Sequence, residues 1–128
     1  MISVATTRGV EVSARPEYLV ERSDPRRSQF LFAYTITITN LGEETVQLIS
    51  REWQITDGDG RVETVAGPGV VGQQPVLAPG ESYCYTSYCP LPTPVGTMHG
   101  HYAMRTATGD AFAAEIAPFT LAAPHAVN

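Results

Sequence analysis

Two short patterns in this sequence contain residue types that could bind a ligand, and the first is rich in glycine. Residues 67–72 read Gly-Pro-Gly-Val-Val-Gly and match G-x-G-x-x-G, a pattern whose backbone amides can hold a phosphate or a nucleotide. The glycines that would form this anion loop are Gly67, Gly69 and Gly72. A dinucleotide site also needs a helix after the loop, but Gln73-Gln74-Pro75 follows, and Pro68 has no amide hydrogen. The segment is therefore either a weak anion site formed by exposed amides or a structural loop that needs positive φ or close backbone approach.

The second pattern is a pair of histidines, His99 and His101. Residues two apart on a strand point to the same side, so the two imidazoles could chelate a transition metal such as cobalt, nickel or zinc. A third ligand would have to come from a neighbouring strand, and the candidates are Asp110, Glu115 and His125. Two ligands alone make a weak site, so we interpret the pair as solvent-facing or hydrogen-bonded histidines. We expect no cofactor.

Other reactive patterns are incomplete. Asp57-Gly58-Asp59-Gly60 resembles the start of a calcium loop, but the twelfth position, which needs a bidentate acid, is Pro68. We predict a hairpin turn there instead. Arg22, Arg26 and Arg27 lie close together in a segment that also contains two acidic residues. We interpret this segment as a solvated loop. Neither G-x-S-x-G nor H-E-x-x-H occurs, so we expect no enzymatic activity.

The two cysteines, Cys84 and Cys89, are five residues apart. On a continuous strand an odd separation places them on opposite faces, roughly 16 Å apart. A disulfide requires Cα atoms within about 4.4–6.8 Å, so we predict two reduced thiols and a cytoplasmic location.

Strands must position these residues. Residues 29–40 alternate large apolar side chains with small or hydroxyl ones, which is typical of a half-buried strand. In residues 46–57 the apolar side chains change parity, from Val46 and Leu48 to Ile49, Trp53 and Ile55. A β-bulge near residues 48–50 would reconcile the two halves, because one extra residue turns every later side chain to the opposite face. Further strands are expected at residues 10–13, 18–20, 61–65, 81–88, 97–106 and 111–121.

These elements predict the fold class. No segment has a helical stripe longer than about two turns, so we predict an all-β fold. The specific expectation is an immunoglobulin-like or fibronectin type III-like β-sandwich of about seven or more strands. Trp53 is the expected central core aromatic, and Pro118 is expected at an edge or a bulge. The length suits a single domain over residues 1–128, with residues 1–7 and 122–128 as loose termini.

The charge balance excludes some partners. The chain has 13 acidic and 8 basic residues, none of them lysine, and a net charge of −5. Binding to nucleic acid depends on neutralising phosphates, so we expect no nucleic-acid partner. No stretch approaches the roughly 18 consecutive apolar residues of a membrane helix, so we expect no membrane partner either.

Five longer segments, spread over nearly the whole chain, form a further pattern. They are Phe32-Ala-Tyr-Thr-Ile-Thr-Ile-Thr-Asn-Leu-Gly42, Arg51-Glu-Trp-Gln-Ile-Thr-Asp-Gly-Asp-Gly60, Gly67-Pro-Gly-Val-Val-Gly-Gln-Gln-Pro75, Pro79-Gly-Glu-Ser-Tyr-Cys-Tyr-Thr-Ser87 and Thr93-Pro-Val-Gly-Thr-Met-His-Gly-His-Tyr102. In this order and spacing, the segments resemble the ApaG family. The resemblance implies a small fibronectin-like β-sandwich and no established enzymatic reaction. It also implies an association with cobalt and magnesium efflux in bacterial members and protein–protein interaction in eukaryotic relatives.

Apolar residues on two connectors rich in proline and glycine complete the functional expectation. Leu91 lies in Pro90-Leu91-Pro92-Thr93-Pro94, and Val70, Val71 and Leu77 lie in the other connector. These side chains either form a rigid docking surface or cover one end of the sandwich. We expect a non-catalytic binding or adaptor domain with a protein partner. The alternatives are a phosphate or nucleotide sensor at Gly67, Gly69 and Gly72, and a metal-binding accessory protein at His99 and His101.

Overall fold

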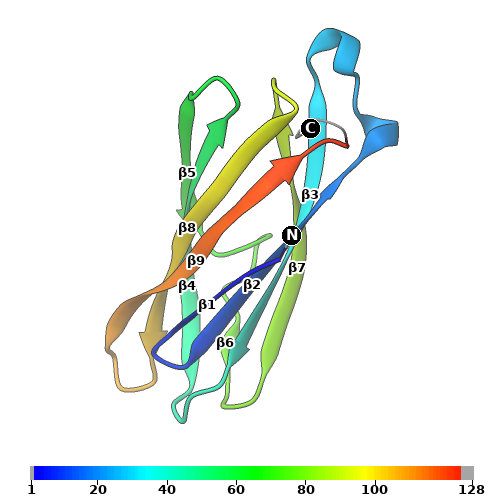
Figure 1. The fold of residues 1–128 in the computed structure, drawn as a ribbon. Helices are drawn as coiled ribbons and strands as arrows, with labels where there is room; N and C mark the ends of the chain where they lie inside the picture. Colours follow the sequence, from blue (N-terminus) through cyan, green and yellow to red (C-terminus); the bar gives the residue numbers. More distant parts are fainter. Residues whose placement is uncertain (1, 125–128) are drawn as a thin grey trace.

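A computed structural model describes residues 2–124 as a sandwich of two antiparallel sheets (Figure 1). The first sheet has the order β1-β2-β3-β7, and its strands are β1 (Ser3–Thr7), β2 (Val10–Tyr18), β3 (Phe30–Asn40) and β7 (Ser82–Leu91). The second has the order β5-β4-β8-β9, with a short strand beside β4; its strands are β4 (Val46–Asp57), β5 (Val62–Pro68), β6 (Val76–Leu77), β8 (Val95–Thr106) and β9 (Ala111–Ala122). The predicted all-β sandwich is confirmed.

The alternation predicted for residues 29–40 is present in β3. Phe32, Ile36 and Ile38 are fully buried between the sheets. The threonines between them lie on the outer face, where Thr35 and Thr39 form hydroxyl–hydroxyl hydrogen bonds with β7 of 3.0 and 2.8 Å. Period-two patterning therefore gave the correct inner face of this strand.

Two irregularities in the second sheet match the sequence expectations. The pairing of β4 with β8 changes register between Leu48 and Ser50, which is the predicted bulge. The pairing of β8 with β9 changes register between Met98 and Gly100, opposite the stretch of β9 that contains Pro118. Proline cannot donate to a ladder, and a bulge is where a strand tolerates it.

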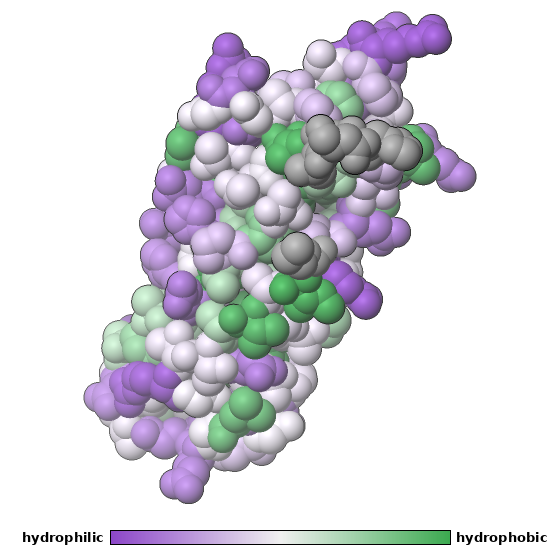
Figure 2. Space-filling model, viewed as in Figure 1, coloured by the Kyte–Doolittle hydropathy of each residue, from purple (hydrophilic) through white to green (hydrophobic). Residues whose placement is uncertain are grey.

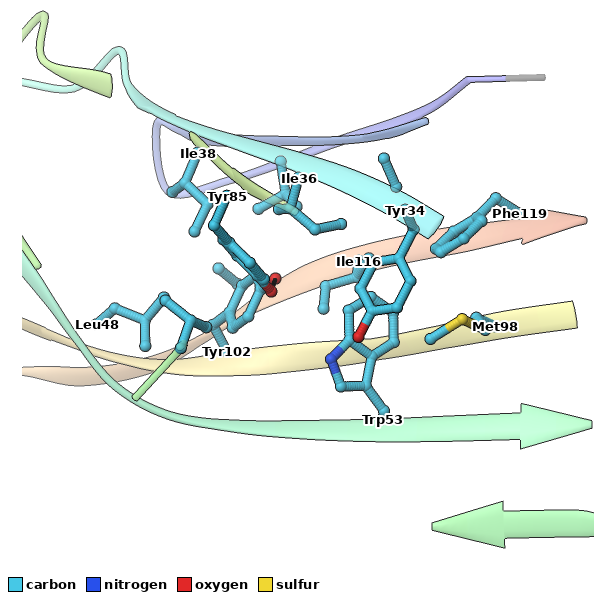
Figure 3. Close-up of a cluster of buried hydrophobic side chains, with 14 of the residues drawn as sticks. Tyr34, Ile36, Ile38, Leu48, Trp53, Tyr85, Met98, Tyr102, Ile116 and Phe119 are labelled. Atoms are coloured by element: carbon cyan, nitrogen blue, oxygen red, sulfur yellow. Dashed lines mark hydrogen bonds between the residues drawn. The ribbon is translucent and has the colours of Figure 1, made fainter. Parts of the chain in front are cut away.

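The core contains the predicted central aromatic and a polar link between the sheets (Figure 3). Trp53 lies at the centre of a cluster of aromatic rings, with its indole edge-on to the ring of Tyr34 at a centroid distance of 5.2 Å. Tyr85 of one sheet and Tyr102 of the other share a hydrogen bond between their buried hydroxyl groups. This bond satisfies both hydroxyls where water does not reach.

The N-terminal prediction is wrong for most of its span. Ser3–Thr7 form β1, which pairs with β2 in a hairpin and lies beside β9 (Figure 1). The Ser3 hydroxyl donates to the carbonyl of Ala117, and the Thr7 hydroxyl accepts the amide of Glu115. At the other end, β9 includes Ala122, and the amide of Ala123 donates to the carbonyl of Pro94. The remainder of the predicted loose C-terminus, residues 125–128, lies outside the described residues.

The two remaining elements are short 3-10 turns between β2 and β3, η1 (Val20–Arg22) and η2 (Pro25–Arg27). No helix in residues 2–124 has the length and hydrophobicity that crossing a membrane requires. On the face formed by β1, β8 and β9, hydrophobic residues are divided into small patches among polar ones (Figure 2).

Candidate functional site

The bulge in β4 determines which side chains enter one side of the sandwich. Before the bulge, Val46 and Leu48 point into the core. After it, the opposite parity points inward, which places Arg51, Trp53 and Ile55 between the sheets. An arginine at an inward position is unusual in a β-sandwich because a buried charge is costly without a partner.

Arg51 and Trp53 line a side cleft of about 300 Å³ between the edge strands β5 and β7. The residues that line this cleft come from β3, β4, β5, β7 and β8; they are Tyr34, Arg51, Trp53, Ile55, Glu63, Val65, Ser87, Tyr88, Cys89, Pro90 and Met98. Tyr34, Trp53 and Met98 form the inner part of the cleft, and they lie together in the core close-up (Figure 3). Charged and polar groups therefore surround an aromatic floor.

The guanidinium of Arg51 reaches from β4 across β5. Its Nη1 donates to the carbonyl oxygens of Pro68 and Gly69, each at 2.9 Å. It can take this path because its partner residue on β5 is Gly67, where a Cβ would lie 3.2 Å from Nη1. Two carbonyls fix the position of the cation, but neither neutralises its charge.

The floor contains a hydrogen-bond donor without an acceptor. Trp53 is almost fully buried, and its indole Nε1 has no hydrogen-bond partner among the described residues. Leaving such a donor unpaired costs about 1–3 kcal/mol. The cleft thus tolerates an energetic defect at one of its most buried residues.

Two titratable groups of the cleft, Tyr34 and Cys89, stay protonated at neutral pH. Burial raises the pKa of Tyr34, and its hydrogen bond with Ser87 opposes part of this effect. Burial, and then the negative charge of Glu63, raise the pKa of Cys89 to about 11. The cleft therefore contains one guanidinium, one carboxylate and several neutral donors.

The glycine-rich segment has a structural explanation at each of its three glycines. Gly67 makes room for Arg51. Gly69 has φ +60°, and a Cβ there would lie 2.3 Å from the carbonyl oxygen of Gln73. Gly72 has φ +80° and forms the tip of a tight turn in which Val70 and Gln73 exchange both backbone hydrogen bonds.

The same segment offers few amides to an anion. The amide of Gly69 donates to Ile49, and those of Val70 and Gln73 donate to each other's carbonyls. Two carbonyls of the loop, those of Pro68 and Gly69, instead accept from Arg51. Anion binding by this loop stays a prediction, and the geometry favours the structural interpretation.

The two histidines lie on the outer face of β8, away from the cleft. In the register of the sheet, His101 is aligned with Glu52 of β4 and Glu115 of β9. Even so, within residues 2–124 no three His, Cys, Asp or Glu side chains form a group that could hold a metal ion. Asp110, another candidate ligand, is 3.7 Å from Arg8, and His125 lies outside the described residues.

The apolar residues predicted on the two connectors separate into core and surface. Leu91, Val70 and Leu77 are buried and cover parts of the sandwich core, so they cannot form a docking surface. Val71 remains exposed. The Pro-rich connector has its own anchor, because the Thr93 hydroxyl accepts the amide of Gly58 and donates to the carbonyl of Val95.

Three further expectations are confirmed. Cys84 is exposed, Cys89 is buried, and both are free thiols. The Asp57–Gly60 segment is a hairpin turn, in which the Asp57 carboxylate accepts the amides of Asp59 and Arg61. The arginine-rich segment is exposed, and there Arg22 lies over the ring of Tyr88 at 5.3 Å and Arg27 pairs with Asp24.

Comparison with known proteins gives the family. The family model for the ApaG domain matches residues 20–106. This chain belongs to the ApaG family. Its relatives named Protein ApaG include one from Methylobacterium sp. (strain 4-46), 55% identical over 121 residues (94% of this chain and 93% of the relative), and one from Rhodospirillum centenum, 56% identical over 119 residues (93% and 92%).

A solved structure supports the fold. The crystal structure of an ApaA protein from Bordetella pertussis superposes with a TM-score of 0.89 at 55% identity, covering 91% of this chain and 94% of that one. The ApaG match at residues 20–106 includes all of β3 to β8, and therefore both rims and the floor of the side cleft.

Proposed function

We propose that this ApaG-family chain is a non-catalytic binding domain that captures an extended segment of a partner protein in the side cleft. One observation carries the proposal: the cleft combines an aromatic floor that contains an unpaired indole N–H with two bordering strands, β5 and β7, each at the edge of its sheet. A free strand edge offers backbone hydrogen bonds to an extended segment, and the floor accepts its side chains.

The protonation states in the cleft support binding over catalysis. A cysteine attacks as the thiolate, and burial holds the Cys89 thiol neutral with a pKa of about 11. Tyr34 is also held in its neutral form, because burial raises its pKa. In their neutral forms Tyr34 and Cys89 can orient a bound backbone, but neither of them supplies a nucleophile or a general base at neutral pH.

The test is selection of peptides from a random library displayed on phage, carried out against the purified protein. The Ser87→Arg variant places a long cation at the rim of the cleft, because Ser87 lines it. The matched control is Thr86→Arg, the adjacent residue of β7, whose side chain lies on the outer face beside Thr35. Thermal unfolding establishes that both variants are folded.

We expect the selected peptides to bind the wild type and Thr86→Arg equally and to lose at least about tenfold in affinity, roughly 1.4 kcal/mol, for Ser87→Arg. Nuclear magnetic resonance shifts of the Trp53 indole N–H then report contact with the floor. Peptides that bind all three proteins equally, or that leave the Trp53 signal unchanged, would contradict the proposal.

A further inference from the structure

We propose that β5 is also a self-association strand, and that two copies of this chain pair through it, antiparallel and centred on Val65, so that Glu63 of each copy meets Arg51 of the other. This inference goes beyond the capture of a partner segment and does not depend on it. Four observations support it: the free edge, the direction of its backbone groups, an apolar residue at its centre and the placement of the two charges.

The first observation is the free edge. Among the described residues, β5 pairs with β4 and with no other strand. Its seven residues are mostly exposed, and only Pro68, at its end, lacks an amide hydrogen. Strand β7, the other rim of the cleft, has Pro90 beside the cleft, and proline interrupts the row of donors that a pairing edge needs.

The second observation is which backbone groups point outward. The amide of Asp57 bonds to the carbonyl of Arg61, and the amide of Gly69 bonds to the carbonyl of Ile49. Antiparallel ladders alternate every second residue, so residues 61, 63, 65, 67 and 69 turn their backbone groups toward β4. Thr64 and Ala66 therefore turn their backbone N–H and C=O groups to the free edge. There Thr64 of one copy can pair with Ala66 of the other, and Ala66 with Thr64.

The third observation is the centre of the strand. Val65 is the middle residue of Val62–Pro68 and is 36% exposed, although its side chain lines the cleft. In an antiparallel pair that uses the whole strand, Val65 of one copy lies opposite Val65 of the other. Directly opposite side chains share a face and lie about 4.5–5.5 Å apart at Cβ, so each valine covers the other.

The fourth observation is the charge placement. In the same register, Glu63 lies opposite Gly67 of the second copy, and the guanidinium of Arg51 lies over Gly67. No carboxylate of the described residues lies within 4.0 Å of that guanidinium in one copy. Self-pairing brings the carboxylate of Glu63 from the second copy to this guanidinium. Because the dimer has two-fold symmetry, the same contact forms twice, as expected of an isologous interface.

Other registers are less favourable. A shift of two residues in one direction places Arg61 opposite Gly67 and therefore brings a second cation to Arg51. The same shift in the other direction places Glu63 opposite Gly69, beyond the end of the strand, so fewer residues of the two strands pair. The register that uses the full strand is thus also one that pairs the charges. Because a single strand pair is a small interface, we expect a weak dimer that salt weakens further.

The main test is sedimentation velocity at increasing protein concentration. We expect the wild type to approach a dimer, while Glu63→Arg and Arg51→Glu each remain monomeric, because each variant alone brings like charges together. An equimolar mixture of these two variants should form a heterodimer, since both charge pairs are then opposite. The matched control is Glu52→Arg, which changes an exposed charge on the outer face of β4 and should dimerise like the wild type.

A second test does not depend on Arg51, whose replacement also removes two hydrogen bonds to the loop. In a Cys84→Ser background, Val65→Cys should form an intermolecular disulfide under a mild oxidant such as diamide, because the residue pairs with itself. Val62→Cys, on the same strand and 56% exposed in the wild type, should not. A wild type that stays monomeric at all concentrations, or equal cross-linking of the two variants, would overturn the proposal. Neither result affects the peptide selection against Ser87→Arg, so failures of the two proposals are distinguishable.

Discussion

The guanidinium of Arg51 occupies the space into which a side chain at Gly67 would extend, with Nη1, Nη2 and Cζ 3.2–3.4 Å from the position of a Cβ there. The two residues are direct partners across the β4–β5 pair. The first glycine of the glycine-rich segment is therefore explained by a cation on the neighbouring strand, without a bound anion.

This contact predicts an interaction between two substitutions. Gly67→Ala should force the guanidinium to shift and weaken its hydrogen bonds to Pro68 and Gly69, which we expect to destabilise the fold by about 1 kcal/mol. In an Arg51→Met background the same change should cost much less, because the fixed guanidinium is gone. Urea unfolding of the four proteins gives the coupling energy directly. A Gly67→Ala cost that is the same in both backgrounds would exclude the contact as its cause.

The Tyr85–Tyr102 hydrogen bond predicts a second cycle. Removing either hydroxyl leaves the other buried without a partner, so Tyr85→Phe and Tyr102→Phe should each lower the free energy of unfolding by about 1–2 kcal/mol. The double variant leaves no unpaired hydroxyl and should be clearly more stable than the sum of the two losses predicts. Strictly additive losses in chemical denaturation would mean that the hydroxyls do not interact.

Cys89 predicts a loss of stability in alkali. Its pKa is raised from 9.0 to about 11 in the folded protein, so above pH 9 the unfolded chain releases a proton that the folded chain retains. The free energy of unfolding should therefore fall from pH 9 upward, in total by roughly 2–3 kcal/mol toward pH 11, at about 1.4 kcal/mol per pKa unit. The buried tyrosines, whose pKa values are also raised, add to the fall above pH 10.

Substitution of this thiol separates its contribution from that of the tyrosines. In Cys89→Val the free energy of unfolding should begin to fall only at about pH 10, where tyrosine in the unfolded chain begins to ionise. Cys84→Ser, which alters the exposed thiol, is the control and should retain the onset near pH 9. Urea unfolding between pH 8 and pH 10.5 measures both, and an unchanged onset in Cys89→Val would contradict the assignment.

The outer face of β8 predicts a negative result with cobalt. His101 is aligned with two glutamates, but no group of three ligands that could hold a metal is formed within residues 2–124. Adding cobalt(II) at about tenfold molar excess should leave the Tm unchanged, since binding to the folded state alone would raise it. Saturable stabilisation that disappears in His101→Ala would restore the metal interpretation.

Much of the fold follows from side-chain periodicity. The change of parity after Leu48 predicted the bulge, because an apolar face must stay on the inside. The odd separation of Cys84 and Cys89 predicted opposite faces of a strand, and the structure has one thiol exposed and the other buried. Strand β1 could not be predicted in this way, since its outward residues include Val4 and its inner ones are small. It is held by hairpin pairing and by two hydroxyl bonds to β9.

The candidate site was less accessible from the sequence. A cleft between β5 and β7 depends on which edges of the two sheets face each other, and strand order is not visible in local periodicity. The sequence also does not show whether an apolar residue on a loop faces solvent or the core. Leu91 and Val70 were therefore compatible with either position, and the structure buries both. The sequence contained one indication of the site. The bulge that turns Trp53 inward also turns Arg51 inward, and an inward-facing arginine is a candidate for a functional residue.

The hydroxyl bonds from Ser3 and Thr7 to β9 have a consequence for assembly. They close one flank of the sandwich, while the flank with β5 stays open. A subunit with one self-associating edge forms a closed dimer. A subunit with two such edges can add further subunits indefinitely. With self-association confined to β5 as proposed above, the closed flank at the first strand makes a dimer, and not a fibre, the end point of assembly.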